Sequence, residues 1–179
     1  MQRLKGFRTI SSNECVTSWS IYPQTIKAVF YTFKPERMLD KYCFFKGDDG
    51  CTNYQQLNDK TRAASVHRGN TLRCDQKDLA TKWYRFTGAS GTLMPTSCVP
   101  KHYCGTHAPG WLSGAHPTGV GQTVSSKVCF HWGGSCCHWH TYVQIKKCNG
   151  FYVYKLGKTP HCWLRYCGNA GFGELFLIF

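Results

Sequence analysis

Ten of the twelve cysteines lie between Cys51 and Cys167, and no other feature restricts the fold of this chain as much. They fall within 117 residues and their number is even. About one cysteine in twelve residues is a density typical of disulfide-bonded domains. The chain has 179 residues, enough to bury a hydrophobic core, so disulfides would add to a core and not replace one. We therefore expect a secreted or extracellular-surface protein from an oxidising compartment.

The first residues do not resemble a secretory leader. Met1–Cys15 contains basic residues but no apolar stretch of seven. Two accounts remain: a cytosolic protein whose cysteines bind metal, or a fragment of a longer secreted or cell-surface glycoprotein. We expect the second. No run approaches eighteen apolar residues, so the sequence predicts no membrane-spanning helix.

Acidic residues are absent from Leu79 to Gly173, a stretch that contains nine lysines and arginines. Paired-carboxylate hydrolysis and calcium binding both need several carboxylates, and a serine or cysteine nucleophile needs an oriented base. We therefore expect no enzymatic activity and no cofactor, since a hydrolase would have to recruit a carboxylate from residues 1–78 or Glu174. The formal charge of +13 favours an acidic partner, although solubility alone explains it equally well.

Residues 123–156 predict a three-stranded antiparallel meander, and with it a mainly β fold. Apolar and polar residues alternate from Thr123 to Trp132, Gly133-Gly134 forms a turn, and a second strand follows over 136–147. Asn149-Gly150 predicts a two-residue hairpin turn with positive φ at both positions, which places Ile145 opposite Tyr154.

The remaining segments divide the chain. Residues 1–50 read as an N-terminal extension of uncertain order, 51–168 as the disulfide-rich small domain, and 169–179 as a short apolar tail. Within the domain we expect a strand over 82–87, loop or short helix over 51–74, and irregular chain over 98–117, where prolines and glycines are frequent.

Residues 129–140 include six cysteines and histidines, which are the residue types that form zinc sites. Neighbouring side chains on a strand point to opposite faces, so Cys136 and Cys137 should bond different partners and not share one ion. We expect no metal, with His138 and His140 as the alternative ligands. Cys15 and Cys43 are candidates for an extra disulfide.

Basic and aromatic residues interleave after 138, as in proteins that stack single-stranded nucleic acid. The alternative function is therefore a cytosolic zinc protein that contacts nucleic acid through its basic surface, although we do not expect nucleic acid to be the partner. A simpler explanation is that the aromatic residues belong to the core. The residues concerned are Trp139, His140, Tyr142, Lys146, Lys147, Tyr152, Tyr154, Lys155 and Lys158.

The cysteine-containing motifs resemble the ten-cysteine domain of uromodulin, the pancreatic zymogen-granule membrane glycoprotein and related zona-pellucida-type extracellular proteins. The matching pieces are KWYRFTG, CVP, CGTHAPGWLSGAHP, VSSKVCFHWGGSCCHWH, CNGFYVYKL and PHCWLRYC. The resemblance implies an extracellular interaction or spacer module without enzymatic activity, whose partner is an extracellular protein or an acidic glycan. Neither the ligand nor the oligomeric state follows from the sequence.

The same resemblance implies a disulfide pattern. The pairs are Cys51 with Cys148, Cys74 with Cys162, Cys98 with Cys136, Cys104 with Cys167, and Cys129 with Cys137. The chain departs from its relatives at the site where they carry an asparagine-linked glycan, because Ser113-Gly114-Ala115 precedes His116 here. No Asn-x-Ser/Thr sequence occurs in the chain, so we expect no such glycosylation and do not transfer a role as a glycan decoy.

Overall fold

The computed structural model describes residues 15–16, 42–43 and 49–172. Contacts divide the chain into two units, Met1–Gly47 and Asp48–Phe179. In the first unit, β1 (Cys15–Val16) and β2 (Tyr42–Cys43) pair antiparallel, with Cys15 opposite Cys43. Their side chains lie outside the described residues, so a bond between these cysteines stays a prediction.

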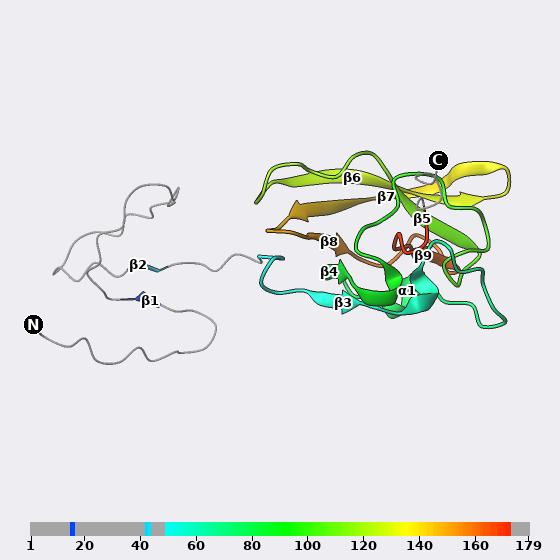
Figure 1. Ribbon diagram of the computed structural model, residues 1–179, viewed down its shortest axis with the longest axis horizontal. Coiled ribbons are helices and arrows are strands. Elements are labelled where there is room, and N and C mark those ends of the chain that lie inside the picture. The colour runs from blue at the N-terminus through cyan, green and yellow to red at the C-terminus, as the bar shows by residue number, and fades with distance from the viewer. Residues whose placement is uncertain (1–14, 17–41, 44–48, 173–179) are drawn as a thin grey trace, which may run out of the picture. The chain divides into compact units, whose positions relative to one another are not determined.

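The second unit is built on one seven-stranded sheet, which confirms the mainly β fold (Figure 1). In spatial order its strands are β3 (Gln55–Leu57), β4 (Lys82–Phe86), β8 (Tyr152–Leu156), β7 (Ser135–Lys147), β6 (Thr123–Trp132), β5 (Ala108–Ser113) and β9 (Leu164–Tyr166). The two outer pairs, β3 with β4 and β5 with β9, are parallel, and the others are antiparallel. The helical elements are short: η1 (Lys60–Arg62), α1 (Asp75–Asp78) and η2 (Gly88–Ser90).

The predicted meander is present as β6, β7 and β8. The turn at Gly133-Gly134 joins β6 to β7, and Ile145 lies opposite Tyr154 as expected. The turn after Cys148 differs from the prediction, because Gly150 has a positive φ of 82° but Asn149 does not. One positive φ, at the third residue of the turn, is the pattern of a type II turn.

The prediction of irregular chain over 98–117 was wrong in part, because β5 lies inside that range. Pro109 and Gly110 are poor strand formers, yet β5 pairs with β6 on one side and β9 on the other. Position 110 needs a glycine because a Cβ there would lie 2.7 Å from the Phe130 ring, which is too close for a normal contact. The short strands β3 and β9 were also not expected.

One face of the sheet carries the main hydrophobic core. Every second residue of each strand points to this face, and the residues between them point to the opposite face. The loop after η2 crosses the core, where the Met94 N–H donates to the Tyr154 hydroxyl at 3.1 Å. The fully buried large side chains of this core include Tyr84, Phe86, Met94, Leu112, Phe130, Ile145, Tyr154, Leu156, Leu164 and Tyr166.

Described residues cover the opposite face of the sheet at its two ends. At one end Trp83, Cys148 and Val153 form a small cluster with the segment that begins at Gly50. At the other end Val99 and Cys104 contribute to a second cluster, against which Trp111 packs. Among residues 49–172, no segment covers the middle of this face on β6 and β7, where Tyr142 is 66% exposed.

Five disulfides connect the sheet and the loops that pack on it. They join the pairs that the family resemblance implies. The bonds are Cys51 with Cys148, Cys74 with Cys162, Cys98 with Cys136, Cys104 with Cys167, and Cys129 with Cys137. Cys136 and Cys137 thus have different partners. Four of the five bonds connect residues at least 38 positions apart, so they hold loops from distant parts of the chain against the sheet.

Candidate binding surface

The uncovered middle of the second sheet face is the candidate binding surface, and we call it the open face. Lys127 on β6 lies directly opposite Tyr142 on β7, and Gln144 on β7 lies opposite Lys155 on β8. The Tyr142 side chain is 66% exposed. Since the two members of each pair share one face, a cationic and an aromatic side chain stand together there.

Lys146 adds a further cation to this face, and its charge is partly balanced by Asp49. The Lys146 ammonium lies 2.7 Å from an Asp49 carboxylate oxygen. The strands β4 to β9 contain no acidic residue, so the positive potential of the open face meets little compensation from the sheet itself.

The predicted stacking platform does not form as one surface. Tyr154 is fully buried, and Trp139 and Tyr152 pack against the main core, on the side opposite to Tyr142. The alternation of a strand sends these aromatic rings to the core face, while Lys146 and Lys155 point to the other face. Lys147 lies on the side of Tyr152 and donates to its hydroxyl at 2.9 Å. The simpler explanation, that most of the aromatic residues are core, is the one that the structure bears out.

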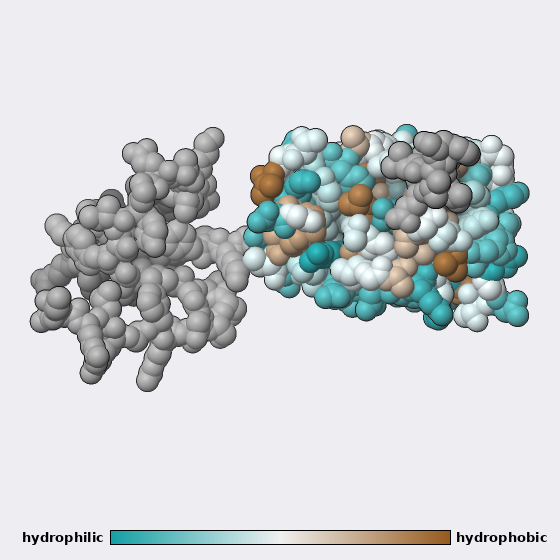
Figure 2. Space-filling view, in the orientation of Figure 1, coloured by the Kyte–Doolittle hydropathy of each residue, from teal (hydrophilic) through white to brown (hydrophobic). Residues whose placement is uncertain are grey.

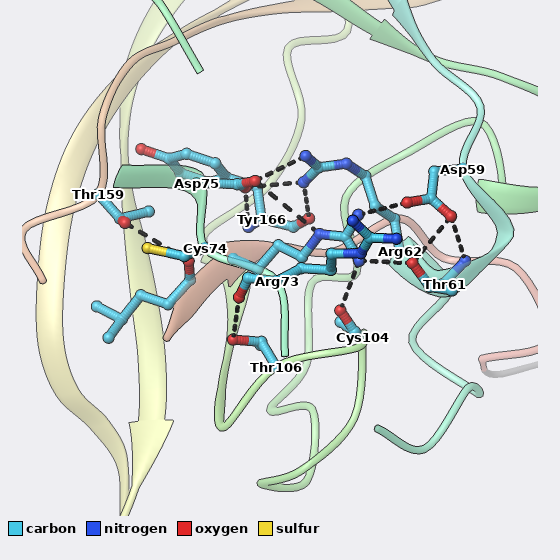
Figure 3. A network of polar contacts seen from close by, with 12 residues as sticks. Asp59, Thr61, Arg62, Arg73, Cys74, Asp75, Cys104, Thr106, Thr159 and Tyr166 are labelled. Carbon is cyan, nitrogen blue, oxygen red and sulfur yellow. Dashed lines mark hydrogen bonds and ion pairs between the residues drawn. The ribbon is translucent and has the colours of Figure 1, made fainter. Parts of the chain in front are cut away.

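Two carboxylates of the domain, Asp75 and Asp59, belong to a network of polar contacts with arginine side chains (Figure 3). Arg62 donates two hydrogen bonds to Asp75, at 2.6 and 2.7 Å, and the backbone N–H of Tyr166 donates to the same carboxylate at 2.9 Å. The Asp75 side chain is fully buried. With its oxygens occupied by these donors, Asp75 is suited to hold β9 against α1 and not to exchange protons with a substrate.

Asp59 is the second carboxylate of this network. Arg165 donates to it at 2.7 Å, and the backbone N–H and hydroxyl of Thr61 donate at 2.9 and 2.8 Å. Burial raises the pKa of Asp59, but these hydrogen bonds outweigh burial and lower the pKa to about 2. A pocket of about 220 Å³ lies beside it, lined in part by Arg73 and Asp78. A carboxylate with so low a pKa is a poor general base at neutral pH.

A zinc site in this domain would need cysteines whose sulfur is not already in a disulfide. In residues 49–172, the group of three metal-ligating side chains is Cys98, His131 and Cys136. Cys98 and Cys136 are bonded to each other, so neither offers the thiolate that zinc needs. His138 and His140 instead make ring contacts with Trp139 and Tyr142, respectively.

Comparison with known proteins gives the family of the domain. Residues 84–168 match the family model of the uromodulin-like domain. This region is a uromodulin-like domain. It includes strands β4 to β9 from Tyr84 onward, and β3 and the preceding segment complete the sheet on its N-terminal side.

Curated relatives share the uromodulin-like domain with this chain. The pancreatic secretory granule membrane major glycoprotein GP2 of dog is 46% identical over 123 residues, which are 68% of this chain and 24% of the relative. Mouse uromodulin is 41% identical over 133 residues, 70% of this chain and 20% of the relative. The chain thus spans about a quarter or less of the length of these relatives.

The location of the chain agrees with that of the glycoproteins it resembles. The chain is a secreted or extracellular-surface protein. Its five disulfides between described residues are of the kind that persists in an oxidising compartment. In the described residues, no helix combines the length and the apolar character that a bilayer crossing requires. On the coloured part of the face in Figure 2, teal and white residues predominate, and the few strongly hydrophobic ones lie apart from each other.

Proposed function

We propose that this chain is a non-enzymatic extracellular interaction module, part of a larger glycoprotein, whose open face binds an acidic partner. The observation that carries the proposal is the pairing of Lys127 with the exposed Tyr142 on a part of the sheet that no described residue covers. A flat face that combines cations with an exposed aromatic ring favours an acidic glycan or an acidic surface of an extracellular protein.

Two further observations support a binding role without chemistry. Asp59 and Asp75 are bound by arginines, and the sequence has no carboxylate between Leu79 and Gly173 that could serve as an acid or base. The cysteines of the domain are bonded to each other, which leaves the cytosolic zinc alternative without its thiolate ligands. A rigid, disulfide-bonded sheet is suited to present side chains to a partner.

Charge reversal on the open face tests the proposal. We expect the Lys127→Glu/Lys155→Glu variant to elute from a heparin column at clearly lower salt than the parent chain. The matched control is Lys77→Glu/Lys158→Glu, which makes the same change in net charge at two exposed lysines outside the open face. If both variants shift equally, net charge and not the open face determines binding, and the proposal fails.

A further inference from the structure

A second cluster of aromatic side chains lies outside the open face, and the proposed function does not use it. His102 and His107 come from the loop before β5, Trp132 ends β6, and Trp163 precedes β9. The His107 ring stacks on Trp132 with centroids 5.6 Å apart and an interplanar angle of 26°. His102 packs edge-on to both rings, and Trp163 lies 6.1 Å from His107. We call these four residues the aromatic cluster.

The backbone of the aromatic cluster is strained. Three non-glycine residues among the described ones have positive φ: His102 at 71°, Cys104 at 58° and Trp163 at 66°. Two of them belong to the cluster and the third lies beside it in sequence. Such conformations persist only where the surroundings enforce them, and they gather at functional sites.

Trp163 is the clearest case of a strained residue held by its surroundings, because its side chain is exposed. The ring is 44% exposed, so burial gives it only part of the stabilisation that a core tryptophan would have. Its carbonyl oxygen is held from two sides, by the Thr106 hydroxyl at 2.6 Å and the Ala108 N–H at 3.0 Å. The neighbouring Cys162 is bonded to Cys74. The fold thus keeps a large aromatic ring at the surface in a backbone conformation that favours glycine.

The charges around the aromatic cluster are positive. Burial lowers the pKa of His102 and of His107, and Arg68 lowers both further, with Lys101 and His67 acting on His102 as well. Arg68 Nε and His102 Nδ1 are buried without a hydrogen-bond partner. Unsatisfied polar atoms and uncompensated cations beside an exposed ring favour a ligand with an anionic group.

We propose that the aromatic cluster binds a pyranose ring that carries a carboxylate, such as a sialic or uronic acid residue of a glycan. The apolar face of the sugar ring packs on the exposed face of Trp163, and the carboxylate lies toward Arg68 and Lys101. Aromatic side chains with a polar edge suit a ligand that is apolar on one face and wet on the other. This site shares no residue with the open face, so either proposal can fail alone.

Titration of the full chain with N-acetylneuraminic acid and with glucuronic acid tests the site, by tryptophan fluorescence and saturation-transfer NMR. We expect at least one acidic sugar to bind at least tenfold more tightly than the neutral methyl β-galactoside. The tighter of the two identifies the source of the carboxylate. If neither binds, or if hexaglutamate competes as well as the sugars do, the proposal is overturned.

Trp163→Gly separates a binding role from a structural one. Glycine adopts the φ of 66° without strain, which offsets part of the packing lost with the half-buried ring. We therefore expect only a modest change in melting temperature, while sugar affinity falls at least tenfold. Val120→Ala shortens an exposed apolar side chain outside both the open face and the aromatic cluster, and it should leave sugar affinity unchanged. A Trp163→Gly variant with parental affinity, or with a strongly lowered melting temperature, contradicts the assignment.

Discussion

Arg62 and Asp75 form a two-point ion pair in the interior of the domain, with side chains 5% and 0% exposed. Arg62 also donates to the carbonyl of Tyr166 at 3.1 Å, and the Tyr166 N–H donates a bond to Asp75. The pair therefore connects η1 and α1 with β9, which lies 91 positions after Asp75 in the sequence (Figure 3).

Breaking this pair from one side should be costly. In Arg62→Met, the buried Asp75 carboxylate would lose the cation that donates two hydrogen bonds to it and keep only Arg165, whose Nε lies 3.9 Å away. We expect a loss of about 3 kcal/mol in the free energy of unfolding. Denaturant titration followed by tryptophan fluorescence measures the loss. Lys77→Met, at an exposed position, should change stability by less than about 0.5 kcal/mol. Equal stability of the two variants would show that the pair is not important for folding.

The disulfides should differ in their contribution according to the loop that each closes. Cys51 and Cys148 are 97 positions apart, so Cys51→Ala/Cys148→Ala should cost about 4–5 kcal/mol in the chain-entropy model. Cys129 and Cys137 are 8 positions apart, and the same replacement there should cost about 2–3 kcal/mol. The order of the two melting temperatures, measured under oxidising conditions, checks this prediction, and a reversed order would contradict it.

Gly168 is a position where a single methyl group should disturb the fold. Its N–H donates to the Arg62 carbonyl, and a Cβ would collide with the backbone carbonyl of Ser90. We expect Gly168→Ala to lower the free energy of unfolding by about 1–3 kcal/mol, because backbone cannot move aside as a side chain can. Gly134→Ala is the control, since a Cβ at Gly134 meets no atom within 4 Å. Similar melting temperatures for the two variants would argue against the close approach.

Asp59 predicts how stability changes in acid. Its pKa in the folded chain is about 2, below the ordinary value of 3.8, so the unfolded chain takes up the proton first. The contribution of Asp59 is complete above about pH 4 and is lost as the pH falls through about 2. The difference in unfolding free energy between the parent chain and Asp59→Asn should therefore shrink as the pH is lowered through this window. A difference that does not change with pH in this range would contradict the prediction.

The sequence predicts best those parts of the fold that depend on local patterns. Alternation in β6, the glycines after Trp132, and the turn at Asn149-Gly150 each need only neighbouring residues, and the meander is present as predicted. β5 is different. Its pairing depends on two strands from elsewhere in the chain, which override the weak strand preference of Pro109 and Gly110.

The sites depend even more on contacts between distant residues. Arg165 meets Asp59 across 106 positions, and no spacing rule connects them. Trp132, His107 and Trp163 meet because the cysteine-bonded loops fold against the end of the sheet. A positive φ at a tryptophan has no signal in the sequence either, because tryptophan does not favour that conformation.

Both outer strands of the seven-stranded sheet are only three residues long, β3 at one margin and β9 at the other. An exposed edge strand has unpaired backbone groups onto which another molecule can add a strand, and such growth leads to aggregation. Short edge strands offer few of these groups. The domain should accordingly stay dispersed at the high concentrations of a secretory product, and any assembly it enters should be built through side chains and not by extending its sheet.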